Sequence, residues 1–141
     1  MKKLMTIVLS ALMLTGCAQT EKQTGTYHQI TMDEAVDMMA EETGYIILDV
    51  WRADEFAAGH IPRAVNVANE DIDTDEIAEL PDKNQLILVY CRSGRRSKEA
   101  AEKLVALGYS NIVEFGGILD WMGEIEKWLW YIKCSTWNKL A

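Results

Sequence analysis

Leu86-Ile87-Leu88-Val89-Tyr90, followed directly by Cys91-Arg92-Ser93-Gly94-Arg95-Arg96, is the most informative stretch of this 141-residue chain. The run from Leu86 to Tyr90 predicts a strand covered on both faces, as strands of parallel sheets are. Residues 97–107 have the apolar spacing of an amphipathic helix, which Gly108 ends. Residues 91–96 therefore form a strand-to-helix turn, where open α/β sheets bind their ligands.

Cys91 is the candidate nucleophile of this turn. The start of a helix carries unpaired N–H groups and a partial positive charge, and both stabilise a thiolate. Four cations follow Cys91 before the first acid, Glu99, and add affinity for anions: Arg92, Arg95, Arg96 and Lys98. The plainer alternatives are an inert buried thiol and a solvated helix start.

Gly94 allows the loop to curl without a steric penalty at Cβ, so that successive N–H groups converge on one sulfur or one bound oxyanion. We therefore predict that Cys91 is the catalytic residue. The predicted substrate-binding residues are the remainder of the loop and the residue after it: Arg92, Ser93, Gly94, Arg95, Arg96 and Ser97.

Outside this stretch, predicted strands and helices alternate. Further strands are expected over 45–50, 64–67 and 111–115. A capping box, Thr31 to Glu34, begins a helix that Gly44 closes, and further helices are expected over 53–58, weakly over 73–80, and from Ile118 onward. This alternation predicts a single α/β domain with a parallel sheet and right-handed crossovers.

The N-terminus has the features of an exported protein. Lys2 and Lys3 precede an apolar stretch, residues 4–14, that is typical of a signal peptide. Leu14-Thr15-Gly16-Cys17 resembles a bacterial lipobox, in which the cysteine is lipidated. We expect residues 1–16 to be a signal peptide and residues 17–26 a lipidated Cys17 with a flexible tether. The protein would be a lipoprotein of the cell envelope facing the extracytoplasmic side; the alternative is an ordinary secretory cleavage site.

Composition limits the partners. The chain is 49% apolar and 26% charged, with a net charge of −8 that becomes −10 once Lys2 and Lys3 leave with residues 1–16. Such an acidic body argues against nucleic acid or an anionic lipid surface as partner. The sequence contains no zinc spacing, Walker loop or dinucleotide fingerprint, so no metal or other cofactor is expected. We expect a monomer.

A spaced set of motifs extends through most of the chain. The set is Asp49-Val50, Glu55-Phe56, Gly59-His60-Ile61-Pro62, Ala64-Val65-Asn66, the loop Tyr90 to Ser97, and Gly116-Gly117-Ile118 with Trp121. Over residues 27–127 it resembles a single-domain rhodanese. The resemblance implies a parallel sheet of about five strands flanked by helices on both faces.

The resemblance also implies a sulfurtransferase. Cys91 would take a sulfane sulfur from thiosulfate or a related small anionic donor, hold it as a persulfide, and pass it to cyanide or an acceptor thiol. His60 would then be structural, with its ring hydrogen-bonded to backbone at the turn.

The chain departs from the family pattern at three places. Trp51 stands where the family has arginine, so an Asp49–arginine contact is in question, and Arg63 replaces a glycine. The tail, residues 128–141, is not matched, and its Cys134 is either an inert thiol or a resolving one. Trp121, Ile125, Trp128 and Ile132 would share one face of the last helix, which caps the core or contacts a membrane interface, unless the terminus is altered and has little function.

Two other function classes compete. Cysteine phosphatases and arsenate reductases have five residues between cysteine and arginine, whereas four separate Cys91 from Arg96. The smaller loop suits a sulfur atom better than a tetrahedral oxyanion. A non-catalytic rhodanese-like binding module is the second alternative, which the presence of Cys91 disfavours.

Overall fold

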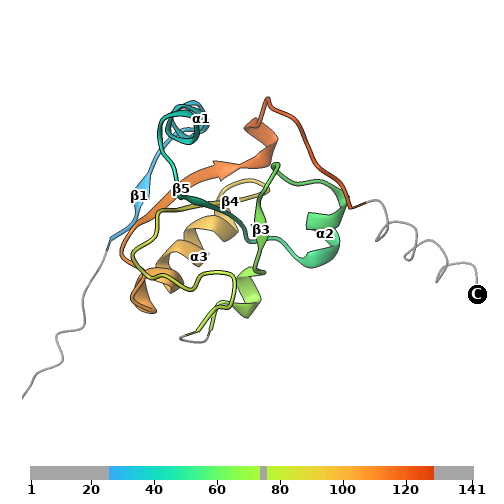
Figure 1. The fold of residues 1–141 in the computed structure, drawn as a ribbon. Helices are drawn as coiled ribbons and strands as arrows, with labels where there is room; N and C mark the ends of the chain where they lie inside the picture. The colour runs from blue at the N-terminus through green and yellow to red at the C-terminus, as the bar shows by residue number, and fades with distance from the viewer. Residues whose placement is uncertain (1–25, 74–75, 129–141) are drawn as a thin grey trace, which may run out of the picture.

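The computed structural model describes residues 26–73 and 76–128 and contains one parallel sheet (Figure 1). Its order is β1-β5-β4-β2-β3. The strands are β1 (His28–Gln29), β2 (Ile46–Asp49), β3 (Val65–Asn66), β4 (Ile87–Cys91) and β5 (Ile112–Gly117). The helices are α1 (Met32–Glu41), α2 (Ala53–Ala58) and α3 (Arg95–Ala106), with 3-10 turns η1 (Asn69–Asp71) and η2 (Ile118–Asp120). The predicted fold class, including a five-stranded parallel sheet, is confirmed.

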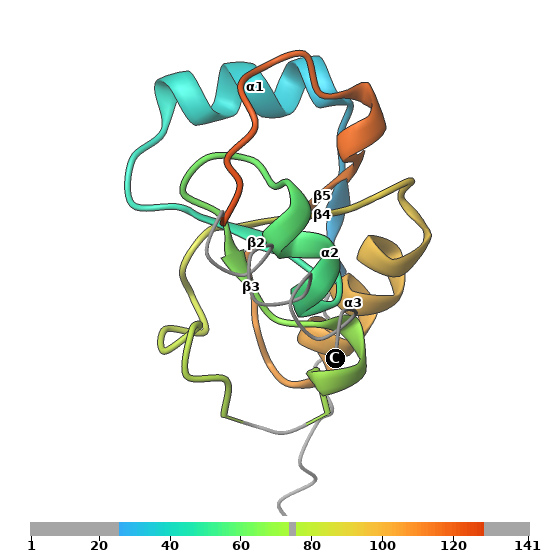
Figure 2. The same cartoon turned by 90° about the vertical axis from the view of Figure 1, so that its right-hand side faces the viewer.

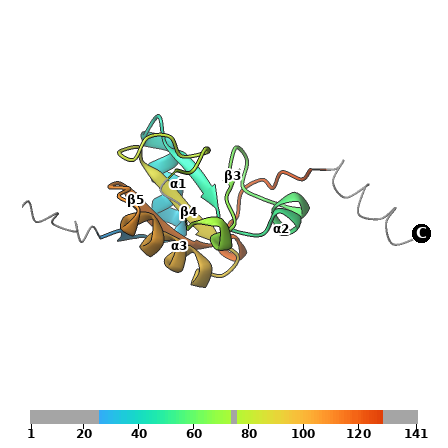
Figure 3. The same cartoon turned by 90° about the horizontal axis from the view of Figure 1, so that it is seen from below.

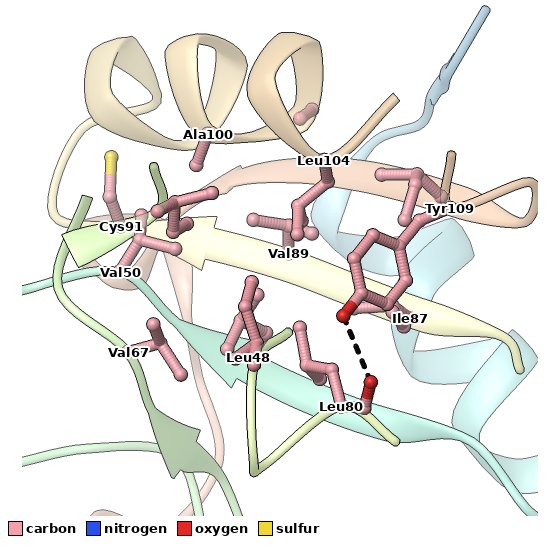
Figure 4. Close-up of a cluster of buried hydrophobic side chains, with 14 residues drawn as sticks. Leu48, Val50, Val67, Leu80, Ile87, Val89, Cys91, Ala100, Leu104 and Tyr109 are labelled. Carbon is pink, nitrogen blue, oxygen red and sulfur yellow. Dashed lines mark hydrogen bonds between the residues drawn. The ribbon is translucent and has the colours of Figure 1, made fainter. Parts of the chain in front are cut away.

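Helices cover both faces of the sheet, as Figures 2 and 3 show for α1 and α3. On the α3 face, apolar side chains of β2 and β4 pack against Ala100, Leu104 and Tyr109 (Figure 4). On the opposite face Ala35 of α1 packs with Tyr90 and Phe115. Because the central strands are buried on both sides, their sequences are continuous apolar runs rather than alternating ones.

The capping box predicted at the first helix is present. The Glu34 N–H donates to Thr31 Oγ1 at 3.3 Å, and the Thr31 N–H donates to the Glu34 carboxylate at 2.7 Å. These bonds satisfy donors that would otherwise be unpaired at the start of α1. The hydrogen bond to Thr31 also lowers the pKa of the Glu34 carboxyl.

The helix predicted over 73–80 is not formed in the part that is described. Residues 76–80 are irregular, and Ile77 and Leu80 enter the core from this segment. The preceding 3-10 turn, η1, is the only helical structure between β3 and β4 in the described residues. The stretch before Pro81 is short, and tertiary burial of its few apolar side chains outweighs its weak helix preference.

The helix predicted from Ile118 is also wrong within the described residues. Only η2 forms there, and residues 121–128 run back toward α2 without forming a helix (Figure 2). Their backbone pairs with other segments: the Glu126 N–H donates to the His60 carbonyl at 2.9 Å, and the Trp128 N–H donates to the Ala57 carbonyl at 3.0 Å. Trp121, Ile125 and Trp128 therefore do not share a helical face. Ile132 and the rest of the tail lie outside the described residues.

Two further predictions also fall outside the described part. Cys17 with the N-terminal segment, and Cys134 in the tail, belong to residues 1–25 and 129–141. Within the described residues, none of the helices has the length and apolar character to span a bilayer.

Candidate active site

The candidate site lies at the carboxyl ends of the strands, where β4 meets the start of α3. The pairing of β4 with β5 is regular up to Val89 and shifts before Cys91, which lies opposite Gly117. Such an irregularity re-aims a side chain at the end of a strand. Figure 4 shows the Cys91 sulfur directed toward the start of α3, at the margin of the apolar cluster.

The Cys91 sulfur has a backbone donor. The Gly94 N–H donates to Sγ at 3.0 Å, although the cysteine as a whole is only 1% exposed. Gly94 has φ of 93° and precedes α3, so a left-handed residue turns the chain from strand into helix. The first N–H groups of that helix have no partner in the preceding turn, and their partial positive charge favours an anion beside them.

The loop rests tightly on the end of β5. A Cβ atom on Gly117 would lie 2.2 Å from the Arg92 carbonyl oxygen, so only glycine fits there. The Leu119 N–H also points to that carbonyl, at 3.4 Å. The Cys91 loop therefore packs directly on the Gly116-Gly117 pair noted in the sequence.

The three loop arginines have different surroundings. Arg96 forms a two-point ion pair with Glu55, at 2.7 and 3.1 Å, which raises the pKa of Arg96 and lowers that of Glu55. Arg95 pairs with Glu99 at 2.7 Å on the surface. Among the residues that the structure describes, no carboxylate pairs with Arg92. Two of the four cations predicted to attract anions are therefore already paired with carboxylates, and Arg92 is the arginine best able to attract an anionic substrate.

Ser97, predicted to bind substrate, lies inside the protein. Its hydroxyl is buried and donates to the Glu114 carboxylate at 2.6 Å, and it also lies 3.0 Å from the Gly94 carbonyl oxygen. The side chain therefore faces the sheet, and its hydroxyl is engaged by Glu114. Ser93, in contrast, is exposed.

Glu114 was missed from the sequence. It is buried in β5 and accepts the Ser97 hydroxyl and the Gly116 N–H with the same oxygen. The signal that points to it is a single carboxylate within the otherwise apolar run 112–115.

Asp49 lies at the end of β2 and contacts no arginine side chain in the described residues. Its Oδ1 accepts the Trp51 N–H at 2.8 Å, while Arg52 pairs with Asp54 on the surface. Burial raises the pKa of Asp49 from 3.8 to about 6, partly offset by the neighbouring Tyr90 hydroxyl and the Trp51 N–H. The departure at Trp51 thus leaves a buried carboxylate without its own arginine.

His60 and Arg63 explain the turn between α2 and β3. His60 Nδ1 lies 2.8 Å from the Phe56 carbonyl oxygen, and the ring stacks on Phe56 at 3.7 Å, so the predicted bond to backbone is confirmed. Arg63 has φ of 64°, a conformation that favours glycine, which is the residue the family places there. The Arg63 side chain donates to the Tyr45 hydroxyl at 2.9 Å.

No cluster of His, Cys, Asp and Glu suited to a metal ion occurs in residues 26–73 and 76–128. The described donor to the Cys91 sulfur is the Gly94 N–H, and the loop around it carries Ser93 and three arginines. This arrangement can hold an anion on sulfur and stabilise it with a backbone N–H group.

Known proteins share this architecture. A family model described as the rhodanese-like domain matches residues 31–124. Thiosulfate sulfurtransferase PspE of Escherichia coli (strain K12) is 32% identical over 73 residues, which cover 52% of this chain and 70% of the relative. A sulfurtransferase of Allochromatium vinosum is 30% identical over 95 residues, covering 67% of this chain and 87% of the relative. The crystal structure of a rhodanese-like domain protein from Staphylococcus aureus superposes with a TM-score of 0.61 at 30% identity and covers 71% of this chain and 97% of that one. The chain therefore belongs to the rhodanese-like domain family, to which the sulfurtransferases of Escherichia coli and Allochromatium vinosum named here are similar.

Proposed function

We propose that this protein transfers a sulfane sulfur through a persulfide on Cys91. The Cys91 thiolate attacks the outer sulfur of thiosulfate or a related donor and forms a new S–S bond. The bond between the two donor sulfurs breaks, and sulfite leaves with its electron pair. The terminal sulfur of the persulfide then bonds to cyanide or an acceptor thiolate, and Cys91 regains its electron pair as a thiolate.

The observation that carries the proposal is the Gly94 N–H at 3.0 Å from Cys91 Sγ, in a loop that continues into the N-terminus of α3. Amides fixed in this way stabilise negative charge without reorganising during the reaction. We infer that the N–H groups of residues 92–96 hold the terminal sulfur of the persulfide. A thiolate attacking sulfur needs no general base, because sulfite departs as an anion.

Thiosulfate as donor is supported by two features. The relative from Escherichia coli is a thiosulfate sulfurtransferase, and Arg92 offers an exposed positive charge in the loop. His60 has no part in this chemistry, since its Nδ1 bonds the Phe56 carbonyl within the fold.

The test is direct. We expect the full chain, incubated with thiosulfate, to gain the mass of one sulfur, and peptide mapping to place it on Cys91 rather than Cys134. Adding cyanide should release thiocyanate and restore the original mass. Cys91→Ser should form no adduct while keeping the far-UV spectrum of the parent, and Cys134→Ser should behave as the parent.

Absence of both adduct and thiocyanate in the folded parent would sink the proposal. Hydrolysis of a phosphate ester or reduction of arsenate in its place would transfer support to the rival reaction of cysteine phosphatases and arsenate reductases. A folded parent inactive in every assay would support the non-catalytic module.

We also propose that Cys17 is lipidated and holds the domain at the extracytoplasmic face of a membrane. The support is the sequence Leu14-Thr15-Gly16-Cys17 after an apolar segment. Two or more acyl chains give stable attachment, whereas one does not. Cys17→Ala should move the protein from the membrane fraction to the soluble fraction, and unchanged partitioning of that variant would defeat this proposal.

A further inference from the structure

Glu114 is a buried charge that the transfer reaction does not use. Its side chain is 2% exposed, and within residues 26–73 and 76–128 no cation pairs with it. Three neutral donors hold the carboxylate: Ser97 Oγ at 2.6 Å, the Gly116 N–H at 2.9 Å and Gln29 Nε2 at 3.2 Å. Burying a carboxylate without a cation is costly, so its contacts call for a physical role.

One carboxylate oxygen joins the two elements that support the Cys91 loop. Oε1 of Glu114 accepts both the Ser97 hydroxyl, from the first turn of α3, and the Gly116 N–H, from the end of β5. These elements also touch each other, because a Cβ atom on Gly94 would lie 3.6 Å from Gly116 Cα. The carboxylate thus fixes the start of the helix against the strand.

The contacts continue from Glu114 to the sulfur. Ser97 Oγ lies 3.0 Å from the carbonyl oxygen of Gly94, and the N–H of the same Gly94 donates to Cys91 Sγ. These two contacts belong to different peptide groups, which meet at the Gly94 Cα. Ser97 therefore restrains one side of Gly94, and the N–H on its other side faces the sulfur.

We propose that Glu114 is a positioning residue for sulfur transfer: through Ser97 and Gly116 it sets the orientation of Gly94, whose amide faces the reacting sulfur. Glu114 itself does not contact Cys91 in any described interaction. This inference rests on the proposed function for its kinetic consequence, and on geometry alone for its structural one.

The kinetic test uses adduct formation on the full chain at several thiosulfate concentrations. Glu114→Ala should lower the maximal rate of Cys91 adduct formation by roughly 10- to 100-fold, because misplacing a catalytic group by an ångström costs up to about that factor. The thiosulfate concentration that gives half the maximal rate should change by less than about twofold, since Glu114 does not touch the donor. Glu114→Gln keeps an oxygen for Ser97 and Gly116 and should restore the rate to within about fivefold.

The matched control is Val113→Ala, the adjacent buried position of β5, whose side chain packs on the α1 face away from the loop. Truncation there lowers stability without touching Ser97 or Gly94. At equal folded fraction, Val113→Ala should transfer sulfur at nearly the parent rate. Equal losses in the two alanine variants would overturn the inference and make Glu114 a structural residue only.

A double-mutant cycle tests the route through Ser97. Ser97→Ala should slow adduct formation, and Ser97→Ala with Glu114→Ala should be no slower than the slower single variant. Fully additive losses would overturn the route, because contacting residues that act as one unit are not additive.

Amide hydrogen exchange separates this inference from the proposed function. Exchange at the Gly94 N–H should be at least about tenfold faster in Glu114→Ala than in Val113→Ala, whatever the protein's activity. If the parent forms no adduct, the proposed function fails while this comparison still decides the role of Glu114. Equal exchange rates at the Gly94 N–H in the two variants would refute the positioning role of Glu114.

Discussion

Cys91 and Asp49 end neighbouring strands at the same edge of the sheet, yet their surroundings differ. Each accepts one backbone N–H, from Gly94 at 3.0 Å and from Trp51 at 2.8 Å. After Cys91 the chain turns through a left-handed glycine into the 12-residue α3. After Asp49 it passes the bulky Trp51 and enters the six-residue α2.

The difference shows what makes a strand end reactive. Asp49 is buried and no cation contacts it in the described residues, and burial raises the pKa of this carboxyl to about 6, which disfavours its charged form relative to an exposed aspartate. Cys91 lies where a helix begins and where the loop can bend around its sulfur. The carboxyl end of a parallel strand places a side chain at the site, and the hydrogen-bond donors that follow it in the chain decide whether an anion is stable there.

The largest effect is expected from adding one methyl group at Gly117, on which the Cys91 loop packs. Gly117→Ala would bring Cβ to 2.2 Å from the Arg92 carbonyl oxygen, so the loop must move. We expect sulfur transfer to fall by about 100-fold or more and stability by roughly 1–3 kcal/mol. Thiocyanate formation and urea unfolding measure the two effects.

The control for Gly117→Ala is Gly44→Ala. Gly44 has φ of 72° and open space around it, far along the chain from the loop, so alanine there costs stability through backbone strain alone. Its transfer rate at equal folded fraction should match that of the parent. An active Gly117→Ala enzyme would show that the loop tolerates displacement from β5.

A pH-dependent loss of stability should mark the Asp49 end. The folded protein holds this proton more tightly than the unfolded chain, so the stabilisation is complete below pH ~4 and is lost as the pH rises through about 6. The rise in the pKa of Asp49 from 3.8 to about 6 corresponds to roughly 3 kcal/mol. Asp49→Asn keeps the oxygen that accepts the Trp51 N–H and should gain stability relative to the parent between pH 4.5 and 7.5.

Urea unfolding of the parent and of Asp49→Asn at pH 4.5 and 7.5 gives the difference in free energy of unfolding between the two proteins. The other carboxyl groups contribute equally to both proteins and drop out of this difference. A parent and an Asp49→Asn variant that change in parallel would mean that Asp49 is ionised throughout, and the contrast between the two strand ends would then disappear.

The smallest effect concerns the charges beside Cys91. Arg92→Ala should raise KM for thiosulfate by about fivefold at low salt, the equivalent of about 1 kcal/mol for two charges 4 Å apart in water. The effect should shrink in 0.5 M salt, because exposed charges are screened. Arg95→Ala is the comparison, since Glu99 already pairs with that guanidinium, and its KM should change by less than about twofold.

Much of the Cys91 end was predictable because its signals are local. The apolar run of β4, the glycine and the amphipathic pattern of α3 are contiguous, so strand, turn and helix follow from neighbouring residues. The loop's ion pairs were not predictable in this way. Arg96 pairs with Glu55, 41 positions away, and only the crossover from β2 through α2 brings them together.

The failures have the same origin. The two-residue β1 exists because His28 and Gln29 pair with Val113 and Glu114, and no local pattern marks so short a strand. Residues 121–128 have helical apolar spacing, but Gly123 packs under the Trp121 indole and the backbone pairs with His60 and Ala57. In both places contacts with residues far away in the sequence determine the local structure.

The shortness of β1 has a practical consequence for anyone shortening this protein. Its two residues and the Ile30 N–H, which donates to the Glu114 carbonyl at 3.0 Å, are what shield the outer edge of β5 in the described structure. A version that starts after Ile30 would expose a row of unpaired amides and carbonyls on an apolar strand, a template for intermolecular pairing and aggregation. Expression boundaries should therefore be drawn upstream of Tyr27.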